Sequence, residues 1–263
     1  ELLSRRYQEY DIIHFHIDYL HFMLARLLDL RQVTTLHGRL DLPDLQALYT
    51  GFDDMPVISV SNAQRRPLPQ ASWAGTVLHG LPTDLLAFSA RPSGYFAFIG
   101  RISPEKRPDR AIEIATRAGL PLKMAAKIDK VDRAYWEGVI APMIAAHPNV
   151  EYIGEIDESQ KADFLGGARA LLFPIDWPEP FGLVMIEAMA CGTPVIAFAS
   201  GSVPEVVDNG LTGYVVGDVE QAVEAVSMVD RLDRRKVRAT FEARFTVERM
   251  ARDYLNLYRL LPG

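Results

Sequence analysis

Short apolar runs alternate with longer amphipathic stretches along the whole chain. The apolar runs are rich in β-branched and aromatic residues, whereas the amphipathic stretches carry apolar residues at helical spacing. This rhythm is typical of βαβ units, in which a parallel sheet is covered by helices on both faces. The pattern therefore predicts an α/β protein with doubly wound parallel sheets.

Residues 80–94 show neither strand nor helix periodicity. They contain Gly, Pro and Ser, so they are the expected linker between two domains. Asp41, Asp218 and Thr246 are expected to cap helices. The expected strands are 11–17, 32–36, 56–60, 76–78, 95–99, 122–127, 150–154, 170–174, 194–198 and 213–216. The expected helices are 19–28, 41–51, 107–118, 132–146, 158–167, 181–190, 203–208 and three within 218–261.

Composition narrows the function classes. The 263 residues are 49% hydrophobic and 24% charged, which is an ordinary globular composition. The formal net charge of −6 argues against a broad nucleic-acid-binding surface. Every apolar run is shorter than the roughly 18–20 residues of a membrane span, so we expect no integral membrane segment. The single cysteine cannot form an internal disulfide.

The first candidate binding segment runs from Gly100 to Lys106, between a predicted strand and a predicted helix. In doubly wound folds, ligands bind at the carboxyl ends of strands. Arg101 and Lys106 could then face one anionic group, and a guanidinium with an ammonium suits a diphosphate. The alternative is a solvated turn with two surface cations.

The second candidate segment holds Glu179 and Glu187, eight positions apart, at the end of a strand and in the helix that follows. At helical rise their carboxylates could address points about 9–12 Å apart, as on an extended ligand. The backbone N–H groups of Phe181, Gly182 and Leu183 would be unpaired first-turn donors. In the alternative interpretation Glu179 only caps the helix and Glu187 lies on the surface. A third strand-end loop, 199–205, has small residues, which a plain turn explains nearly as well.

Two segments together resemble a known family. GRISPEKRPDRAIE (100–113) and LLFPIDWPEPFGLVMIEAMACGTPVIAFASGSVPEVVDNGLTGYVV (171–216) closely resemble the donor domain of family-4 retaining glycosyltransferases of the GT-B fold, and Glu179 and Glu187 match its E-x7-E motif. Residues 10–94, with DIIHFHID and TTLHG, resemble the second half of the acceptor-side domain. The resemblance implies a truncated acceptor-side Rossmann-like domain (1–88), a nucleotide-sugar-binding Rossmann-like domain (89–245) and a helix crossing back (246–263).

The resemblance also implies roles for individual residues. Arg101 and Lys106 would hold the donor diphosphate. Glu179, beside the three backbone amides, would accept hydrogen bonds from the hydroxyls of the donor sugar, and Glu187 would bind the ribose hydroxyls. His37, from the opposite domain, would touch the transferred sugar. Arg101, Lys106, Glu179 and His37 are therefore the expected catalytic residues, and Gly100 belongs to the donor-binding set.

The implied reaction moves a sugar from a nucleotide-diphosphate sugar to an unidentified acceptor with retention of configuration. Arg101 and Lys106 would stabilise the charge that grows on the leaving diphosphate. Because the chain has no Asp-x-Asp sequence, we expect neither a metal nor a cofactor beside the donor substrate. Because a single cysteine gives no reason to expect an oxidising compartment, we expect a cytoplasmic location, and peripheral membrane contact stays open.

Alternative functions were weighed against this one. His14, His16 and His21 with Asp18 could bind a metal, or His16 could be packed or face the substrate. Trp177 could stack on a sugar or pack at the rim. Cys191 at a helix end is expected to be a small buried residue and not a nucleophile, whose activation would require an electropositive site.

Other enzyme classes are distinguishable by sequence. A nicotinamide-dependent dehydrogenase should carry G-x-G-x-x-G, which is absent. A GT-B sugar-nucleotide epimerase shares the donor motifs. A third alternative is a fragment that binds the donor but transfers weakly, because the chain opens at Glu1 and has few residues before the second domain. The sequence does not specify the base, the sugar or the acceptor.

Overall fold

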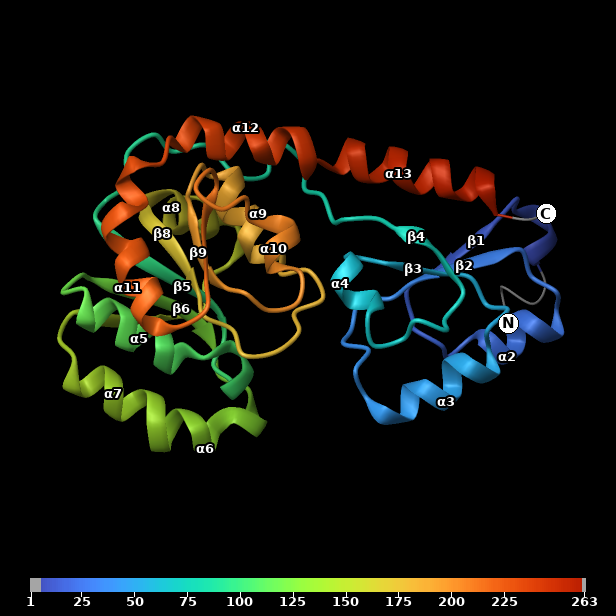
Figure 1. Cartoon of the computed structure of the whole chain (residues 1–263), viewed down its shortest axis with the longest axis horizontal. Coiled ribbons are helices and arrows are strands. Elements are labelled where there is room, and N and C mark those ends of the chain that lie inside the picture. Colours follow the sequence, from blue (N-terminus) through green and yellow to red (C-terminus); the bar gives the residue numbers. More distant parts are fainter. Residues whose placement is uncertain (1–5, 262–263) are drawn as a thin grey trace.

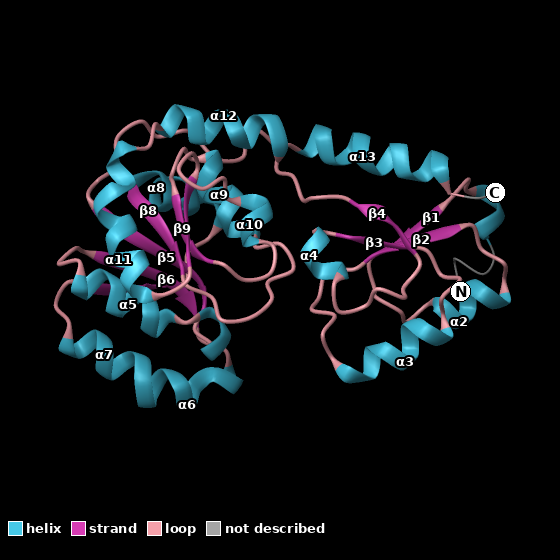
Figure 2. Ribbon diagram, in the orientation of Figure 1, coloured by secondary structure: helices cyan, strands magenta, loops and turns pink. Residues whose placement is uncertain are grey.

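The computed structural model describes residues 6–261, so the outermost residues of the first and last expected segments, 1–5 and 262–263, lie outside the described part. Two parallel sheets form the centres of two domains (Figures 1 and 2). The first sheet has the order β1-β2-β3-β4, with strands β1 (Ile13–Phe15), β2 (Gln32–Thr35), β3 (Val57–Ser59) and β4 (Trp73–Thr76). The second contains β5 (Tyr95–Arg101), β6 (Leu122–Lys127), β7 (Val150–Gly154), β8 (Ala168–Phe173), β9 (Val195–Phe198) and β10 (Gly213–Val216).

The second sheet is doubly wound. Its order is β10-β9-β8-β5-β6-β7, and all its paired strands are parallel. The chain starts in the middle at β5, extends to β7 on one side, and then returns to β8 on the other. The winding direction therefore reverses between β5 and β8, which is where folds of this type bind ligands.

Alternating side chains of β5 show how the layers are built. Phe96 and Phe98 are buried against α5, α7 and α11, whereas Ala97 is buried on the opposite face with α8, α9 and α12. Both faces are apolar because helices cover both. The helices of this domain are α5 (Pro108–Arg117), α6 (Arg133–Tyr135), α7 (Ala141–Ala146), α8 (Glu158–Gly167), α9 (Leu183–Ala190), α10 (Val203–Val206), α11 (Val219–Met228) and α12 (Arg234–Arg244). A π-helical stretch (Trp136–Ile140) joins α6 to α7, and 3₁₀ turns occupy Pro104–Lys106, Lys130–Asp132 and Val229–Arg231.

The first domain is small. A 3₁₀ turn (Tyr7–Glu9) opens it, followed by α2 (Phe22–Leu27), α3 (Pro43–Gly51) and α4 (Asn62–Arg65). Phe22, Leu36, Tyr49 and Leu68 form the centre of its core on one face of the sheet. The other face is covered by the last helix of the chain.

That last helix, α13 (Val247–Leu260), follows α12 along one side of the molecule and packs against the first sheet (Figure 1). Tyr254 and Tyr258 lie beside His14, and a Cβ at Gly75 would meet the side chain of Leu257 at 2.7 Å. Thr246 caps the helix by accepting a hydrogen bond from the Arg249 amide, as predicted. The C-terminal helix thus ties the two domains together.

Several local predictions are wrong. The helix expected from residue 181 begins at Leu183, because Gly182 takes the left-handed backbone conformation (φ +78°) at its N-cap. Strand β5 continues through Gly100 and Arg101, which pair with Ala126 and Lys127. Asp41 does not cap α3, since its carboxylate is paired with the Arg39 guanidinium instead.

Candidate donor-binding site

Three adjacent strands of the second sheet end at one edge, and their loops form the candidate site. Strand β8 lies between β5 and β9, and the strands are parallel, so the segments 102–106, 174–182 and 199–205 follow the carboxyl ends of neighbouring strands. The position is the reversal point of the winding. All the second-domain residues predicted to bind a donor lie on or next to these segments or on α9.

Glu179 is the centre of this site. Its side chain is buried and only 8% of the residue is exposed. Lys106 Nζ and the indole Nε1 of Trp177 both donate to the Oε2 atom of Glu179, the latter at 2.9 Å. The Lys106 ammonium also lies 4.8 Å from the centre of the Trp177 ring. The burial of this carboxylate is tolerated because it is paired with a lysine. The Oε1 atom of Glu179 has no hydrogen-bond donor among the described residues, so it can accept a hydrogen bond from a ligand.

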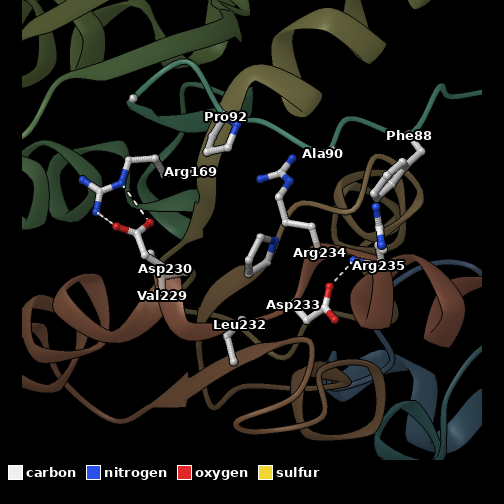
Figure 3. A pocket seen from close by; sticks show the side chains of 12 residues that line it. Phe88, Ala90, Pro92, Arg169, Val229, Asp230, Leu232, Asp233, Arg234 and Arg235 are labelled. Atoms are coloured by element: carbon white, nitrogen blue, oxygen red, sulfur yellow. Dashed lines mark hydrogen bonds and ion pairs between the residues drawn. The ribbon is translucent and has the colours of Figure 1, made fainter.

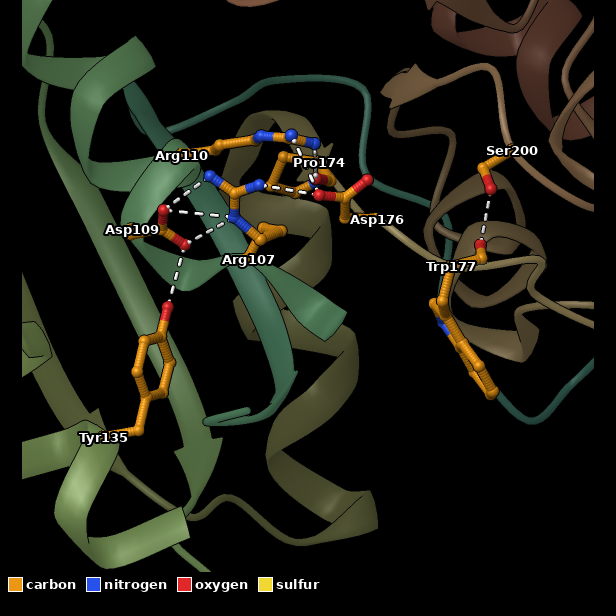
Figure 4. Close-up of polar contacts among 8 residues, drawn as sticks. All are labelled: Arg107, Asp109, Arg110, Tyr135, Pro174, Asp176, Trp177 and Ser200. Carbon is orange, nitrogen blue, oxygen red and sulfur yellow. Dashed lines mark hydrogen bonds and ion pairs between the residues drawn. The ribbon is translucent and has the colours of Figure 1, made fainter. Parts of the chain in front are cut away.

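The loop before Glu179 is anchored on both sides (Figure 4). Arg107 and Arg110 donate to the Asp176 carboxylate at 2.8 and 3.1 Å. Ser200 Oγ donates to the Trp177 carbonyl oxygen at 2.5 Å. These contacts hold the main chain of the loop, so the position of Glu179 does not depend on Lys106 alone.

Three backbone N–H groups next to Glu179 are available to a ligand. The amides of Phe181, Gly182 and Leu183 have no hydrogen-bond acceptor among residues 6–261. Only Leu183 belongs to the helix, which corrects the expectation that all three lie in its first turn. The start of α9 nevertheless presents free donors beside the carboxylate, a combination that suits oxygen-rich ligands such as sugars and phosphates.

Arg101 and Lys106 do not share a partner in this structure. Lys106 contacts Glu179, whereas the Arg101 guanidinium contacts Glu105 and lies 3.5 Å from the Asp132 carboxylate. Gly100 lies within β5, and a Cβ at this position would meet nothing within 4 Å. The structure therefore brings Lys106 together with Glu179, and keeps Arg101 in a neighbouring acidic group.

Glu187, in the second turn of α9, is also paired with a lysine. Lys161 Nζ on α8 donates to its Oε1 atom at 2.8 Å. Only 12% of the Glu187 side chain is exposed, so the alternative interpretation that it lies free on the surface does not hold. Lys161 was not among the predicted site residues. No sequence motif around Lys161 identifies it as a site residue.

His37 follows β2 and lies in a row of rings that leads to the second domain. His16 Nδ1 and His37 Nε2 are 2.8 Å apart, the His37 ring stacks on His79 at 5.4 Å, and His79 meets the edge of Phe181 at 5.0 Å. Burial lowers the pKa of His37, and burial with the neighbouring cations lowers the pKa of His79 to about 4. His79 was missed, although it follows β4 as His16 and His37 follow β1 and β2.

The histidines do not gather into the suggested metal site. The ring centres of His14 and His16 are 4.2 Å apart in a tilted arrangement, but His21 turns away to Gln32 and Thr34 inside the core. Within the described residues no group of three or more His, Cys, Asp or Glu side chains could hold a metal ion.

Two further residues connect the domains near the site. Ser61 Oγ, at the start of α4, donates to the Pro180 carbonyl oxygen at 2.6 Å. The carboxylate of Glu205, on α10, accepts hydrogen bonds from the first backbone amides of α4. Sequence reasoning missed both, because each contact joins residues more than 100 positions apart.

A cavity of about 520 Å³ is lined by Arg169 and Pro194, which lie at the amino ends of β8 and β9, away from the candidate site. Figure 3 shows Arg169 with Arg234 and other side chains that line this cavity. Its Arg234 guanidinium donates to the carbonyl oxygens of Ser89, Gly166 and Ala168, so it holds the fold together and is not free for an anion. Cys191 is fully buried, and burial raises its pKa to about 12, as expected for an unreactive thiol. Across residues 6–261, no helix is long and apolar enough to span a membrane.

Comparison with known proteins identifies the family. The family model described as "Glycosyl transferases group 1" matches residues 89–234. D-inositol 3-phosphate glycosyltransferase of Mycobacterium bovis (strain BCG / Pasteur 1173P2) is 30% identical over 207 residues, which cover 77% of this chain and 39% of that protein. The chain thus spans well under half the length of this curated relative.

Solved structures agree in fold. Anabaena HepE, crystallised in complex with UDP and glucose, superposes with a TM-score of 0.82 at 17% identity, covering 99% of this chain and 82% of that one. Sucrose-phosphate synthase from Thermosynechococcus elongatus gives 0.79 at 23% identity, with 99% and 76% covered. These likenesses confirm the predicted GT-B fold, in which the first domain is small. The chain belongs to the group 1 family of glycosyl transferases.

Proposed function

We propose that the protein binds a nucleotide-diphosphate sugar at the carboxyl edge of the second sheet and transfers the sugar to an acceptor with retention of configuration. The observation that carries this proposal is Glu179. It is a buried carboxylate with one oxygen held by Lys106 and Trp177, while the other oxygen and three nearby backbone N–H groups have no partner among residues 6–261. Such a group accepts hydrogen bonds from sugar hydroxyls, while the adjacent amides donate to oxygens.

Lys106 supplies the positive charge for the diphosphate. Its ammonium has three N–H donors and directs one of them to Glu179, and the other two have no acceptor among the described residues, so they can bind phosphate oxygens. Arg101 joins it by exchanging Glu105 and Asp132 for the more highly charged diphosphate. As the bond to the sugar breaks, negative charge grows on the leaving diphosphate, and preorganised cations stabilise it most strongly where water is excluded. The proposed reaction needs no metal.

The first domain supplies the acceptor side. His37 is held by His16 and His79, and the latter contacts Phe181 next to the proposed sugar position. The identity of the acceptor is left to experiment. HepE was crystallised with UDP and glucose, so uridine diphosphate sugars are the first donors to test.

A thermal-shift screen of UDP-, GDP- and ADP-sugars tests donor binding, because a ligand at 100 times its dissociation constant stabilises a protein by about 2.7 kcal/mol. Glu179→Gln should lose most of the shift, whereas Glu137→Gln, on an exposed helical turn, should keep it. NMR of the transferred sugar, with and without EDTA, then tests retention and metal independence. An inverted anomeric carbon, or activity abolished by EDTA and restored by a divalent metal, would contradict those parts of the proposal.

A further inference from the structure

Each glutamate of the E-x7-E pair has a lysine partner from another segment of the chain. Lys106 is paired with Glu179 and Lys161 with Glu187. Side-chain exposures are 22% and 10% in the first pair and 19% and 12% in the second, which makes them the two most buried ion pairs between described residues. Pairs this buried are costly to desolvate and weak evidence for stability alone, so a ligand-related role for both is worth testing.

Lys161 lies between two carboxylates. Its Nζ atom donates to Glu187 Oε1 at 2.8 Å and to Glu158 Oε2 at 2.9 Å. Burial by itself lowers the pKa of the Lys161 ammonium, but the hydrogen bonds with Glu187 and Glu158 outweigh burial, and the pKa is raised overall. Lys161 therefore stays charged, and one of its three N–H donors has no acceptor among residues 6–261.

The two partners thus offer complementary groups to one ligand. Glu187 Oε1 is engaged by Lys161, whereas its second oxygen has no donor among the described residues and can accept a hydrogen bond. A hydroxyl group both donates and accepts, and a vicinal diol can meet a carboxylate and an ammonium side by side. Glu158, at the first turn of α8, holds the ammonium from the other side and limits its motion.

From this arrangement we infer that Lys161 is a specificity-determining residue, which donates a hydrogen bond to the ribose diol of the nucleotide while Glu187 accepts one from it. The inference rests on the proposed function. It predicts that the site distinguishes a ribonucleotide from its 2′-deoxy counterpart, because the deoxy ligand leaves a buried polar group without its partner.

The test uses the whole chain and isothermal titration with the nucleoside diphosphate, UDP, GDP or ADP, that the unaltered protein binds most tightly. Its 2′-deoxy counterpart and inorganic pyrophosphate are titrated in parallel. The unaltered protein should prefer the ribonucleotide by about tenfold or more, the effect of one well-buried hydrogen bond. Lys161→Met should reduce that preference to within about threefold, with pyrophosphate binding unchanged.

Lys161→Gln keeps a hydrogen-bond donor but loses the charge, so it should retain part of the preference for the ribonucleotide. This variant replaces Lys161→Met in the test if the latter does not fold. Lys123→Met removes a more exposed lysine, 3.5 Å from Glu151 in the same domain, and should behave like the unaltered protein. An unchanged ribose preference in a folded Lys161 variant would overturn the inference alone. Failure of the unaltered protein to bind any of the three diphosphates would overturn the proposed function as well, so the two failures are distinguishable.

Discussion

The carboxylate of Glu205 accepts a hydrogen bond from the backbone N–H of Asn62 at 2.8 Å, and this contact joins the second domain to the first. The same carboxylate also accepts from the Ala63 amide at 2.6 Å and from the Asn62 side chain at 3.0 Å. These amides open helix α4 and have no partner within it. The relative position of the two domains is thus stabilised by a charged group at a helix start.

Substituting Glu205 should loosen the two domains. Glu205→Ala leaves the amide of buried Ala63 without its acceptor, which costs about 1–3 kcal/mol, whereas the amide of exposed Asn62 can bind water instead. We expect a larger radius of gyration by small-angle X-ray scattering, since Glu205 supplies one of the contacts that hold the two domains together. Glu220→Ala removes a surface carboxylate that pairs with Arg117 inside one domain and should leave the scattering unchanged. Identical scattering curves for the Glu205 and Glu220 variants would refute the interdomain role.

Gly201 should be indispensable for the shape of the donor site. A Cβ at this position would lie 2.2 Å from the backbone oxygen of Glu179, and φ is +56°. Gly201→Ala should therefore displace Glu179 and weaken nucleotide-sugar binding by at least about tenfold, the effect of losing one buried hydrogen bond.

Gly210→Ala is the matched control for that experiment. Gly210 also has a positive φ of +78°, but nothing lies within 4 Å of the position of its Cβ. It should lose about 1 kcal/mol of stability from backbone strain and keep its ligand affinity. Equal affinity losses in the two variants would show that strain, and not the contact with Glu179, is responsible.

Acid should destabilise the protein partly through His79. Burial, with His37, Arg249 and His16 nearby, lowers the pKa of His79 from 6.5 to about 4 in the folded state. As pH falls below 6.5 the unfolded chain binds a proton that the folded chain refuses until about pH 4, so stability decreases across that window. The shift corresponds to at most ~3 kcal/mol, which solvent screening reduces to about 1–2 kcal/mol.

Urea unfolding at pH 7.5 and pH 5.0 measures this effect. His79→Phe keeps an aromatic ring between His37 and Phe181 but cannot titrate, so its loss of stability between the two pH values should be smaller by about 1–2 kcal/mol. His147→Asn removes a histidine far from this row and should retain the full pH dependence. If the Phe variant loses as much stability as the unaltered protein, His79 is not the group responsible.

Cys191 should be inert in the folded protein. Its thiol is fully buried, and burial raises its pKa to about 12. Because the thiolate is the reactive form, we expect a dithionitrobenzoate reagent to give no signal at pH 8 over minutes, and one equivalent per chain after denaturation. Rapid labelling without unfolding would contradict the buried position.

Strand order explains why the edge of the site was predictable. Carboxyl ends of parallel strands meet at one edge, so Lys106, Glu179 and the 199–205 loop could be placed together from the alternation of strands and helices alone. The same rule applied to the first sheet would have found His79. The motif spacing of Glu179 and Glu187 needed no coordinates either.

The interaction partners of these residues were harder to predict from the sequence. Lys106 pairs with Glu179 and Arg101 with Glu105, and nothing in their spacing distinguishes this choice from a shared anion. Lys161 contacts Glu187 only because α8 and α9 lie together. The start of α9 depended on the left-handed backbone conformation of Gly182, which the sequence pattern alone did not reveal.

The central claim is that Glu179 holds the sugar of a nucleotide-diphosphate donor, and the most direct test compares two affinities in two proteins. Isothermal titration should show that the unaltered protein binds the nucleotide sugar more tightly than the nucleoside diphosphate alone. In Glu179→Gln this extra affinity should disappear, because a hydrogen bond to a charged group is worth about 1.5–3 kcal/mol. The affinity for the nucleoside diphosphate should stay within about threefold of that of the unaltered protein. An undiminished gain from the sugar in the folded variant would contradict the account.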